Sequence, residues 1–283
     1  MRKIGTALAA VLLTLAVAAP ASASSGYDHA RIYDLSLGDS LSVGVQPTGD
    51  PANDYRTNDG YADRLFELAR QSQPNLTLVK LGCPGESSRT MIEGGICAYP
   101  HGSQLDEAVA FLKAHRSKVA FVTIDLGAND FPCNDIPCIP QGVASIQGHL
   151  PAVVAALRDA AGPDVPIVGM TIYDPLLAAW FLGPDGQAFA HASVDQAIHP
   201  LDQMLTGIYA AGGARVADVE GTFSTTDFDT LVDLAGAGTV PLNVARICQW
   251  TWSCAPAPLG PNNHANADGY RVIARAFADQ LGI

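Results

Sequence analysis

The ten residues 35–44, LSLGDSLSVG, decide the expected fold, because they join a buried strand to a sharp turn that carries a reactive side chain. The apolar run that begins at Ile32 is typical of a short interior strand, and it stops at Gly38. Gly38 permits a sharp turn, and the following Asp39 and Ser40 can cap what comes next. A serine at the carboxyl end of a buried strand lies where α/β sheets bind ligands. Ser40 is therefore either a functional group or only a capping residue, and this stretch alone does not choose.

The rest of the chain alternates between two hydrophobic patterns. Apolar or β-branched runs typical of strands occupy 32–37, 76–81, 119–124, 165–172 and 215–219. Between and after them, apolar residues recur at helical spacing over ranges that begin near residues 61, 105, 143, 194 and 268. This alternation predicts a parallel sheet covered by helices on both faces, which is a three-layer α/β/α sandwich. Two stretches, 175–190 and 221–261, lack a clear period, and we expect long loops there.

The N-terminal 23 residues have the pattern of a secretory signal peptide. Arg2 and Lys3 precede an apolar core over 4–19, and the small residues 21–23 form a cleavage site. A membrane anchor is the alternative, but the apolar core is short and cleavable. We therefore expect secretion, without a stable membrane anchor, and one mature domain over 24–283.

The net charge of −12 argues against partners that are themselves negatively charged. Nucleic acid and anionic membrane surfaces attract basic proteins, so we expect neither as a partner.

The six cysteines fall into three pairs that are close in sequence. In an oxidising compartment we expect disulfides between these neighbours: Cys83–Cys97, Cys133–Cys138 and Cys248–Cys254. Six cysteines allow fifteen connectivities, and the sequence does not select one rigorously. A metal site is the competing interpretation, but no pair has Cys-x-x-Cys spacing and no histidine cluster accompanies them. We expect no metal and no cofactor.

Polar groups follow several of the predicted strands where the strands end. Gly85 lies in a tight loop after the second strand, Asn129 follows the third, and His264 precedes the last helix. Because the carboxyl ends of parallel strands share one edge of a sheet, we expect these groups to gather near Ser40. A serine, a base and preorganised hydrogen-bond donors are the parts that acyl transfer needs.

Four blocks, taken in order, resemble the GDSL or SGNH hydrolase family. They are GDSL at 38–41, PGES at 84–87, GAND at 127–130, and His264 ahead of the Gly-Tyr pair at 269–270. Each block is short, but together they span nearly all of the chain after residue 23. With the signal peptide and the local cysteine pairs, the chain is similar to secreted actinobacterial lipases and esterases of that family.

The resemblance implies a flavodoxin-like α/β/α sandwich, the SGNH hydrolase fold, and hydrolysis of carboxylic esters through an acyl-serine intermediate. It implies that Ser40 is the nucleophile and His264 the general base and acid. The oxyanion hole would be formed by the N–H groups of Ser40 and Gly85 and by the Asn129 amide, with Gly82 as the alternative to Gly85. The implied substrate is a small-molecule or lipid ester, and we expect a monomer.

Several functions remain open beside a lipase or simple esterase. A carbohydrate acetyl esterase and a phospholipid acyl hydrolase use the same chemistry, and a non-catalytic lipid- or glycan-binding module would use the same cleft. The absence of a Gly-x-Ser-x-Gly elbow argues against an α/β-hydrolase. The apolar side chains of the two irregular stretches either line an acyl pocket or pack onto the edge of the domain.

One position departs from the family pattern. The family usually has Asp three residues before the histidine, and this chain has Pro261. Proline cannot supply a carboxylate, but main-chain oxygens in 259–263 and Asn side chains there remain acceptors. We therefore expect a Ser40–His264 dyad, without a catalytic carboxylate, in which such an oxygen accepts from His264 Nδ1–H. Asp268 is the rival partner, but a capping role at the start of the last helix is expected for it.

Overall fold

The computed structural model describes residues 32–50, 53–131 and 138–283, and residues 31–283 form one compact unit. The predicted signal peptide at 1–23 and the domain boundary at residue 24 lie outside the described residues.

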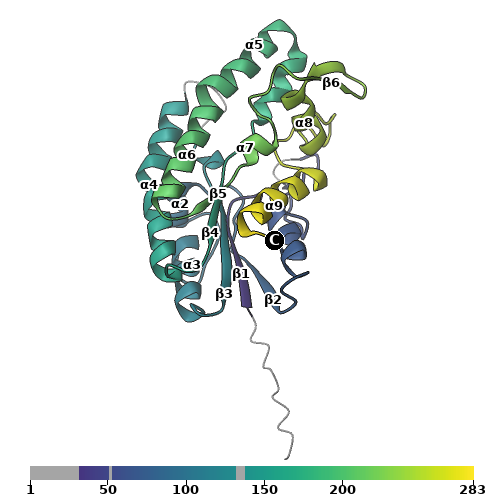
Figure 1. Ribbon diagram of the computed structural model, residues 1–283. Helices are drawn as coiled ribbons and strands as arrows, with labels where there is room; N and C mark the ends of the chain where they lie inside the picture. Colours follow the sequence, from purple (N-terminus) through teal and green to yellow (C-terminus); the bar gives the residue numbers. More distant parts are fainter. Residues whose placement is uncertain (1–31, 51–52, 132–137) are drawn as a thin grey trace, which may run out of the picture. The chain divides into compact units, whose positions relative to one another are not determined.

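A five-stranded parallel sheet forms the middle layer (Figure 1). Its strands are β1 (Ile32–Gly38), β2 (Leu76–Lys80), β3 (Val119–Asp125), β4 (Ile167–Met170) and β5 (Arg215–Ala217). They are arranged in the order β2-β1-β3-β4-β5, which is the flavodoxin-like order. The predicted fold class is therefore confirmed, and each strand overlaps the range expected for it.

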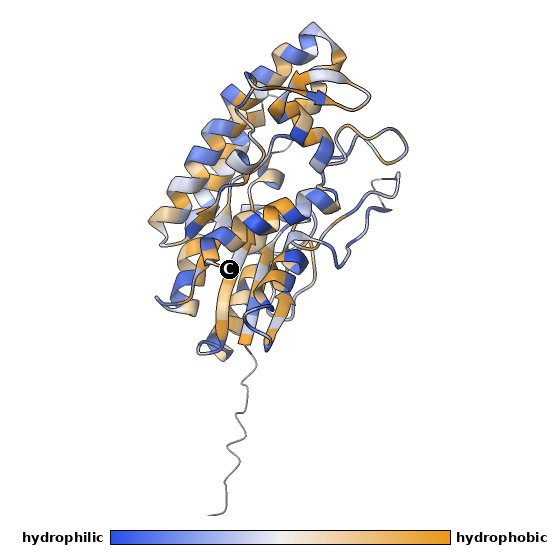
Figure 2. Cartoon of the chain, turned by 45° about the vertical axis from the view of Figure 1, so that its right-hand side comes forward, coloured by the Kyte–Doolittle hydropathy of each residue, from blue (hydrophilic) through white to orange (hydrophobic). Residues whose placement is uncertain are grey.

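Helices cover both faces of this sheet. On one face, α1 (Tyr61–Ala69) and α9 (Ala267–Leu281) bury apolar residues in a shared cluster. On the other, α3 (Gln104–Ala114), α4 (Ile139–Ala161) and α6 (His199–Ala211) bury theirs in a second cluster. The short α2 (Ser88–Glu93) packs against α4. Figure 2 shows the amphipathic pattern, with blue and orange alternating along the helices and orange dominating the strands.

The prediction of a loop over 175–190 is wrong, because this stretch is helical. A 3₁₀ helix, η4 (Pro175–Leu182), leads into α5 (Pro184–Ser193), and a π turn, η5 (Val194–Ile198), joins α5 to α6. Asp174 caps η4 by accepting from the Leu176 N–H, and the φ of +87° at Gly183 separates the two helices. Proline and glycine therefore bracket short helices here instead of breaking them.

The stretch over 221–261 also contains regular structure that its sequence did not reveal. After α7 (Val219–Thr222), a hairpin of β6 (Leu231–Leu234) and β7 (Gly238–Pro241) leads into α8 (Leu242–Trp250). The prediction of one long loop is wrong because these elements are four to nine residues long, too short for a clear period.

Two of the predicted disulfides are present, Cys83–Cys97 and Cys248–Cys254. The third predicted pair includes Cys133, which lies outside the described residues. Within the described ranges, no helix combines the length and the apolar character needed to cross a membrane.

The turn at the end of β1 depends on a close approach between two strands. Gly38 pairs in register with Asp125 of β3 and has a φ of +120°. A Cβ at this position would lie 2.0 Å from Asp125 Oδ1 and 2.3 Å from its carbonyl oxygen. The Gln104 side chain closes the other side, accepting from Gly38 N–H at 2.6 Å and donating to Gly38 O at 3.0 Å. Only glycine fits between them.

We therefore expect Gly38→Ala to destabilise the fold by at least about 2 kcal/mol, from positive-φ strain and the clash with Asp125 together. Gly148→Ala is the matched control, because Gly148 is exposed inside α4 and a Cβ there would have nothing within 4 Å. It should stabilise the fold by up to about 1 kcal/mol. Denaturant unfolding of both variants measures these effects. Equal stability of Gly38→Ala and the parent chain would contradict the close approach.

Candidate active site

The predicted nucleophile lies in the turn directly after β1. Residues 40–44 form this turn and not the start of a helix, so Ser40 is not a helix cap. Asp39 holds the turn, since its Oδ1 accepts from Leu41 N–H at 3.0 Å and its carbonyl oxygen accepts from Ser42 Oγ at 2.7 Å. Ser40 is half-buried, and its Oγ lies 3.4 Å from Asp39 Oδ1. The serine hydroxyl thus stands at the carboxyl edge of the sheet.

Beneath this turn lies a pair of buried acids. Asp39 and Asp125 are both almost fully buried, and Asp125 Oδ2 is 3.4 Å from Asp39 N. Burial raises the pKa of Asp39. Burial and the neighbouring Asp39 charge together raise the pKa of Asp125 well above its usual range. Tyr61 donates to Asp125 Oδ1 at 2.9 Å, which helps to fix the pair under the nucleophile turn.

Two backbone N–H groups near Ser40 are available as donors. In the described part of the chain, neither Ser40 N–H nor Gly85 N–H donates a hydrogen bond to another protein group. Gly85 is exposed, has a φ of +85° and has nothing within 4 Å of a Cβ position. Gly82 is buried, and a Cβ there would meet Ser42 Oγ at 1.9 Å. Gly85 therefore faces open space, whereas Gly82 packs against the nucleophile turn.

Asn129 follows β3 in a short 3₁₀ turn, η2 (Ala128–Asp130). Its Nδ2 donates to Asp39 Oδ2 at 3.0 Å and to the Glu86 carbonyl oxygen at 3.1 Å. The side-chain amide thus links the nucleophile turn to the Gly85 loop. Both of its N–H groups have acceptors, so an oxyanion would be bound by exchanging or sharing one of them.

The sequence did not predict the hydrogen bonds of Asp130 that join these loops. Asp130 accepts from Ser88 N–H at 2.9 Å, from Ser88 Oγ at 2.6 Å and from Ser145 Oγ at 2.6 Å. It is buried, and it ties η2 to the start of α2 and to α4. The available signal was its place beside Asn129 in the GAND block, where a buried acid needs donors from elsewhere in the chain.

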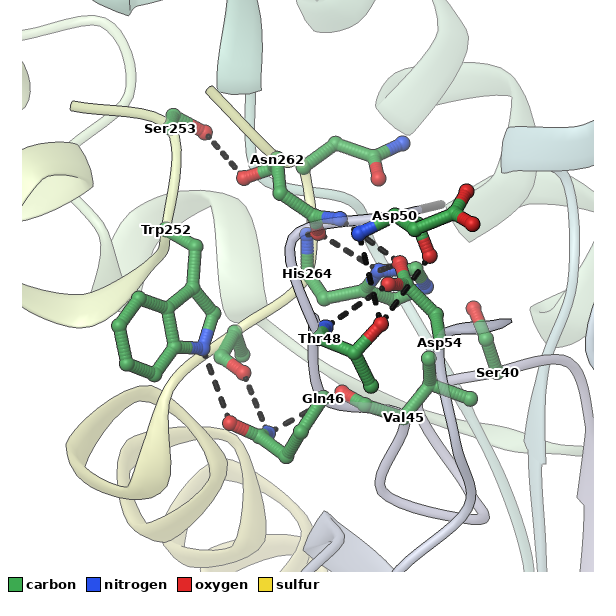
Figure 3. Close-up of polar contacts among 12 residues, drawn as sticks. Ser40, Val45, Gln46, Thr48, Asp50, Asp54, Trp252, Ser253, Asn262 and His264 are labelled. Carbon is green, nitrogen blue, oxygen red and sulfur yellow. Dashed lines mark hydrogen bonds and ion pairs between the residues drawn. The ribbon is translucent and has the colours of Figure 1, made fainter. Parts of the chain in front are cut away.

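The imidazole of His264 contacts the side-chain amide of Asn262 (Figure 3). His264 Nδ1 lies 2.8 Å from Asn262 Oδ1, and the backbone N–H of His264 donates to the same oxygen at 3.0 Å. Asn262 Nδ2 donates in turn to Asp54 Oδ2 at 2.8 Å. A backbone N–H only donates and an ionised carboxylate only accepts, so both ends fix the orientation of the amide. In this arrangement the proton of neutral His264 is on Nδ1, which leaves Nε2 unprotonated.

The acceptor for His264 is thus an Asn side chain, one of the two kinds of oxygen expected from the sequence. Asp268 is not a partner of the ring, because its side chain is 67% exposed and pairs with Arg271. The expected capping role is also wrong for Asp268, since Asn266 caps α9 by accepting from the N–H groups of Asp268 and Gly269. No signal in the sequence pointed to Asp54, which lies 208 residues before Asn262.

The loop that carries His264 is fixed from several sides. Backbone hydrogen bonds join Trp252 N to His264 O at 3.0 Å and Asn262 N to Trp252 O at 3.1 Å. Tyr173 donates to the Asn263 carbonyl oxygen at 2.7 Å, and Gln46 donates to that of Ala265 at 3.0 Å. The Cys248–Cys254 disulfide encloses Trp252 in a short loop. These contacts preorganise a segment that has little secondary structure of its own.

Ser40 and His264 are not hydrogen-bonded to each other in the described part of the chain. Such contacts are commonly long in a free site and shorten when substrate binds. Burial lowers the pKa of His264, and the negative charges of Asp39 and Asp54 oppose this effect. The charge of Asp39, the residue next to Ser40, therefore favours the protonated form of the His264 ring. Within the described ranges, no cluster of three or more His, Cys, Asp or Glu residues is arranged to hold a metal ion.

Comparison with known proteins finds a matching family model and solved structures with a similar fold. The model of the GDSL-like lipase/acylhydrolase family matches residues 36–272. No curated protein sequence matches the chain. An extracellular lipase from Streptomyces rimosus has a similar structure, at 18% identity and a TM-score of 0.55, with 88% of this chain and 99% of that one covered. An acetylxylan esterase from Geobacillus stearothermophilus is similar at 17% identity and a TM-score of 0.52, with 89% and 94% covered.

The burial of His264 leads to a pH prediction. A base with a lowered pKa is neutral at lower pH, so ester hydrolysis should persist below the ordinary histidine pKa of 6.5. The acid limb of kcat/KM should have its midpoint under this value, with Asp39 and Asp54 as the facing acids. A pH profile of kcat/KM, together with the His264 Cε1–H resonance followed by NMR, measures it. A midpoint above 6.5 that matches the NMR titration would contradict the dominance of burial.

Proposed function

Because the chain belongs to the GDSL-like lipase/acylhydrolase family and is a carboxylic ester hydrolase, we propose that Ser40 is its nucleophile and His264 its general base. The observation that carries this proposal is the arrangement of His264. Its Nδ1–H donates to Asn262 Oδ1 at 2.8 Å, so Nε2 is unprotonated and can accept the Ser40 hydroxyl proton.

The reaction divides into two steps. Ser40 Oγ attacks the ester carbonyl while His264 Nε2 takes the hydroxyl proton, and the imidazolium then protonates the departing alkoxide. In the second step, water attacks the acyl-serine and gives a proton to the same nitrogen, and the imidazolium then protonates Ser40 Oγ as the acyl–Oγ bond breaks and the carboxylic acid leaves. The protonated ring is the state that nearby negative charge stabilises, and Asp39 and Asp54 supply that charge.

The oxyanion formed in each step needs donors that are already in place. We assign this role to Ser40 N–H, Gly85 N–H and the Asn129 amide. The first two have no protein acceptor in the described ranges, and Gly85 faces open space, which supports them as donors. Asn129 is held between Asp39 and Glu86, and one of its N–H groups would turn to the oxyanion as negative charge develops there.

We also propose that the protein is secreted after cleavage near Ser24 and acts as a monomer on a small-molecule or lipid ester. The basic and apolar pattern over 1–23 supports export. The disulfides Cys83–Cys97 and Cys248–Cys254 agree with an oxidising compartment. Intact-mass measurement of protein from the culture medium tests the cleavage, and retention of residues 1–23 would contradict it.

Turnover of a series of p-nitrophenyl esters, from acetate to long acyl chains, tests the activity. We expect hydrolysis by the parent chain and its near-complete loss in Ser40→Ala and His264→Ala, both with unchanged folding. A fluorophosphonate probe should add its mass to Ser40 alone. Cleavage of acetate only would favour deacetylation, and cleavage of longer chains would favour lipase action. A folded parent chain that cleaves no ester would favour the binding module.

Asn129→Ala should lower kcat by about 10²–10³-fold with little change in KM, because the lost donor acts on charge that develops after binding. Asp130→Asn is the control for the loop, since it weakens the hydrogen bonds from Ser88 and Ser145 but leaves the Asn129 amide in place. We expect the control to lose mainly thermal stability. If kcat of Asn129→Ala fell only in step with its folded fraction, the amide would be structural.

A further inference from the structure

Asp54 is a mostly buried acid near His264, and the proposed reaction so far uses only its charge. It lies in the loop between the nucleophile turn and α1, and its side chain is 10% exposed. A backbone bridge between Gln46 and Tyr55 closes this loop, with N···O distances of 3.0 and 3.2 Å. Asp54 Oδ1 accepts from Thr48 N–H at 3.2 Å, and Oδ2 accepts from Asn262 Nδ2 at 2.8 Å. The carboxylate is thus held in a fixed position.

Within the described ranges, His264 is the only basic group close enough to pair with Asp54, and it forms an ion pair only when its ring is protonated. Asp54 Oδ2 lies 4.0 Å from His264 Nδ1, and no Lys or Arg of those ranges pairs with it. A buried carboxylate without a cation is unfavourable, so protonation of the imidazole relieves it. That protonated ring forms in both steps of the proposed reaction.

The Asn262 amide lies between the Asp54 carboxylate and the His264 ring, so the carboxylate affects the ring through the orientation of the amide (Figure 3). If the amide rotated by half a turn, its oxygen would face the Asp54 carboxylate and its NH₂ would face the His264 N–H groups. All three hydrogen bonds of the amide would then be lost. The carboxylate therefore keeps Asn262 Oδ1 aimed at His264, which keeps the ring proton on Nδ1.

We propose that Asp54 is a positioning residue that acts on His264 through Asn262, and that the two side chains together replace the carboxylate that Pro261 cannot supply. This inference rests on the proposed Ser40–His264 chemistry. A direct carboxylate would contact Nδ1–H itself. Here an amide makes the contact, and the charge lies one side chain further away.

The acidic groups around His264 determine how its pKa should change when one of them is removed. Asp39 acts on the ring from the end of β1, and Asp54 acts from the loop that follows the nucleophile turn. Asp50, in the same loop as Asp54, accepts from Asn53 Nδ2 at 2.7 Å. Removing the Asp54 charge leaves Asp39 in place, so the pKa of His264 should fall further but the ring should still titrate.

Asp54→Asn tests the charge while keeping the shape. We expect kcat to fall about 10-fold with KM nearly unchanged, and the pKa of His264, read from the Cε1–H resonance, to fall measurably below that of the parent chain. Asp268→Asn is the matched control, because it makes the same change at an exposed acid four residues after His264. We expect it to alter neither value. An unchanged His264 pKa in folded Asp54→Asn would overturn the proposal.

Exchanging the two side chains gives the sharper test. In the double variant Asn262→Asp with Asp54→Asn, the new carboxylate at position 262 accepts from His264 Nδ1–H, and the new amide at position 54 donates to that carboxylate. We expect kcat to recover to within about 3-fold of the parent and the pKa of His264 to rise above the parent value. Losses that multiply in the double variant would mean that Asp54 only packs the loop, which overturns the proposal.

The NMR titration needs no turnover, so it separates this inference from the proposed function. If the parent chain cleaved no ester while the His264 pKa still fell in Asp54→Asn and rose in the exchanged variant, the link from Asp54 would stand and the hydrolase mechanism would fail. If Ser40→Ala abolished turnover while both titrations matched the parent, the mechanism would stand and the role of Asp54 would fail.

Discussion

The hydrogen bond from His264 Nδ1–H to Asn262 Oδ1 is the contact on which the proposed chemistry depends. A histidine is useful as a base only if its free nitrogen faces the nucleophile, and the partner of the other nitrogen decides which one is free. An amide presents either its oxygen or its NH₂ group to the ring, and only the oxygen can accept from Nδ1–H. A carboxylate can accept in either orientation. The backbone N–H of His264 and the Asp54 carboxylate remove that ambiguity, so the proposed mechanism gives a neutral side chain the task of orienting the ring.

A second constraint lies under Ser40. Gly38 lets β1 approach β3 closely, and the turn that follows buries Asp39 against Asp125. The Asp39 carboxylate then accepts from the Asn129 amide, which itself reaches the Gly85 loop. One buried acid therefore sets the position of the serine relative to the two loops that carry Gly85 and Asn129. This network explains why the GDSL block includes an acid that does not itself need to react.

The sequence predicted those parts of the structure whose signals are local. Buried parallel strands read as continuous apolar runs, so the five strands, the layer order and the loops at their carboxyl ends were predictable. The helices over 175–193 were not, because they are short and bracketed by Pro and Gly. Pro261 made it possible to expect a neutral acceptor for His264. Asp54 could not be found, because its contact with Asn262 joins positions 208 residues apart and leaves no periodic or spacing signal.

The most direct test of the proposed chemistry is the tautomer of His264 at neutral pH, read from the ¹⁵N shifts of its ring in labelled protein, with His264→Gln to assign the resonances. We expect a protonated Nδ1 and an unprotonated Nε2, because Asn262 Oδ1 can only accept. A ring protonated at Nε2 would place the free nitrogen against Asn262, away from Ser40. That result would contradict both the orientation of the amide and the role of His264 as the base.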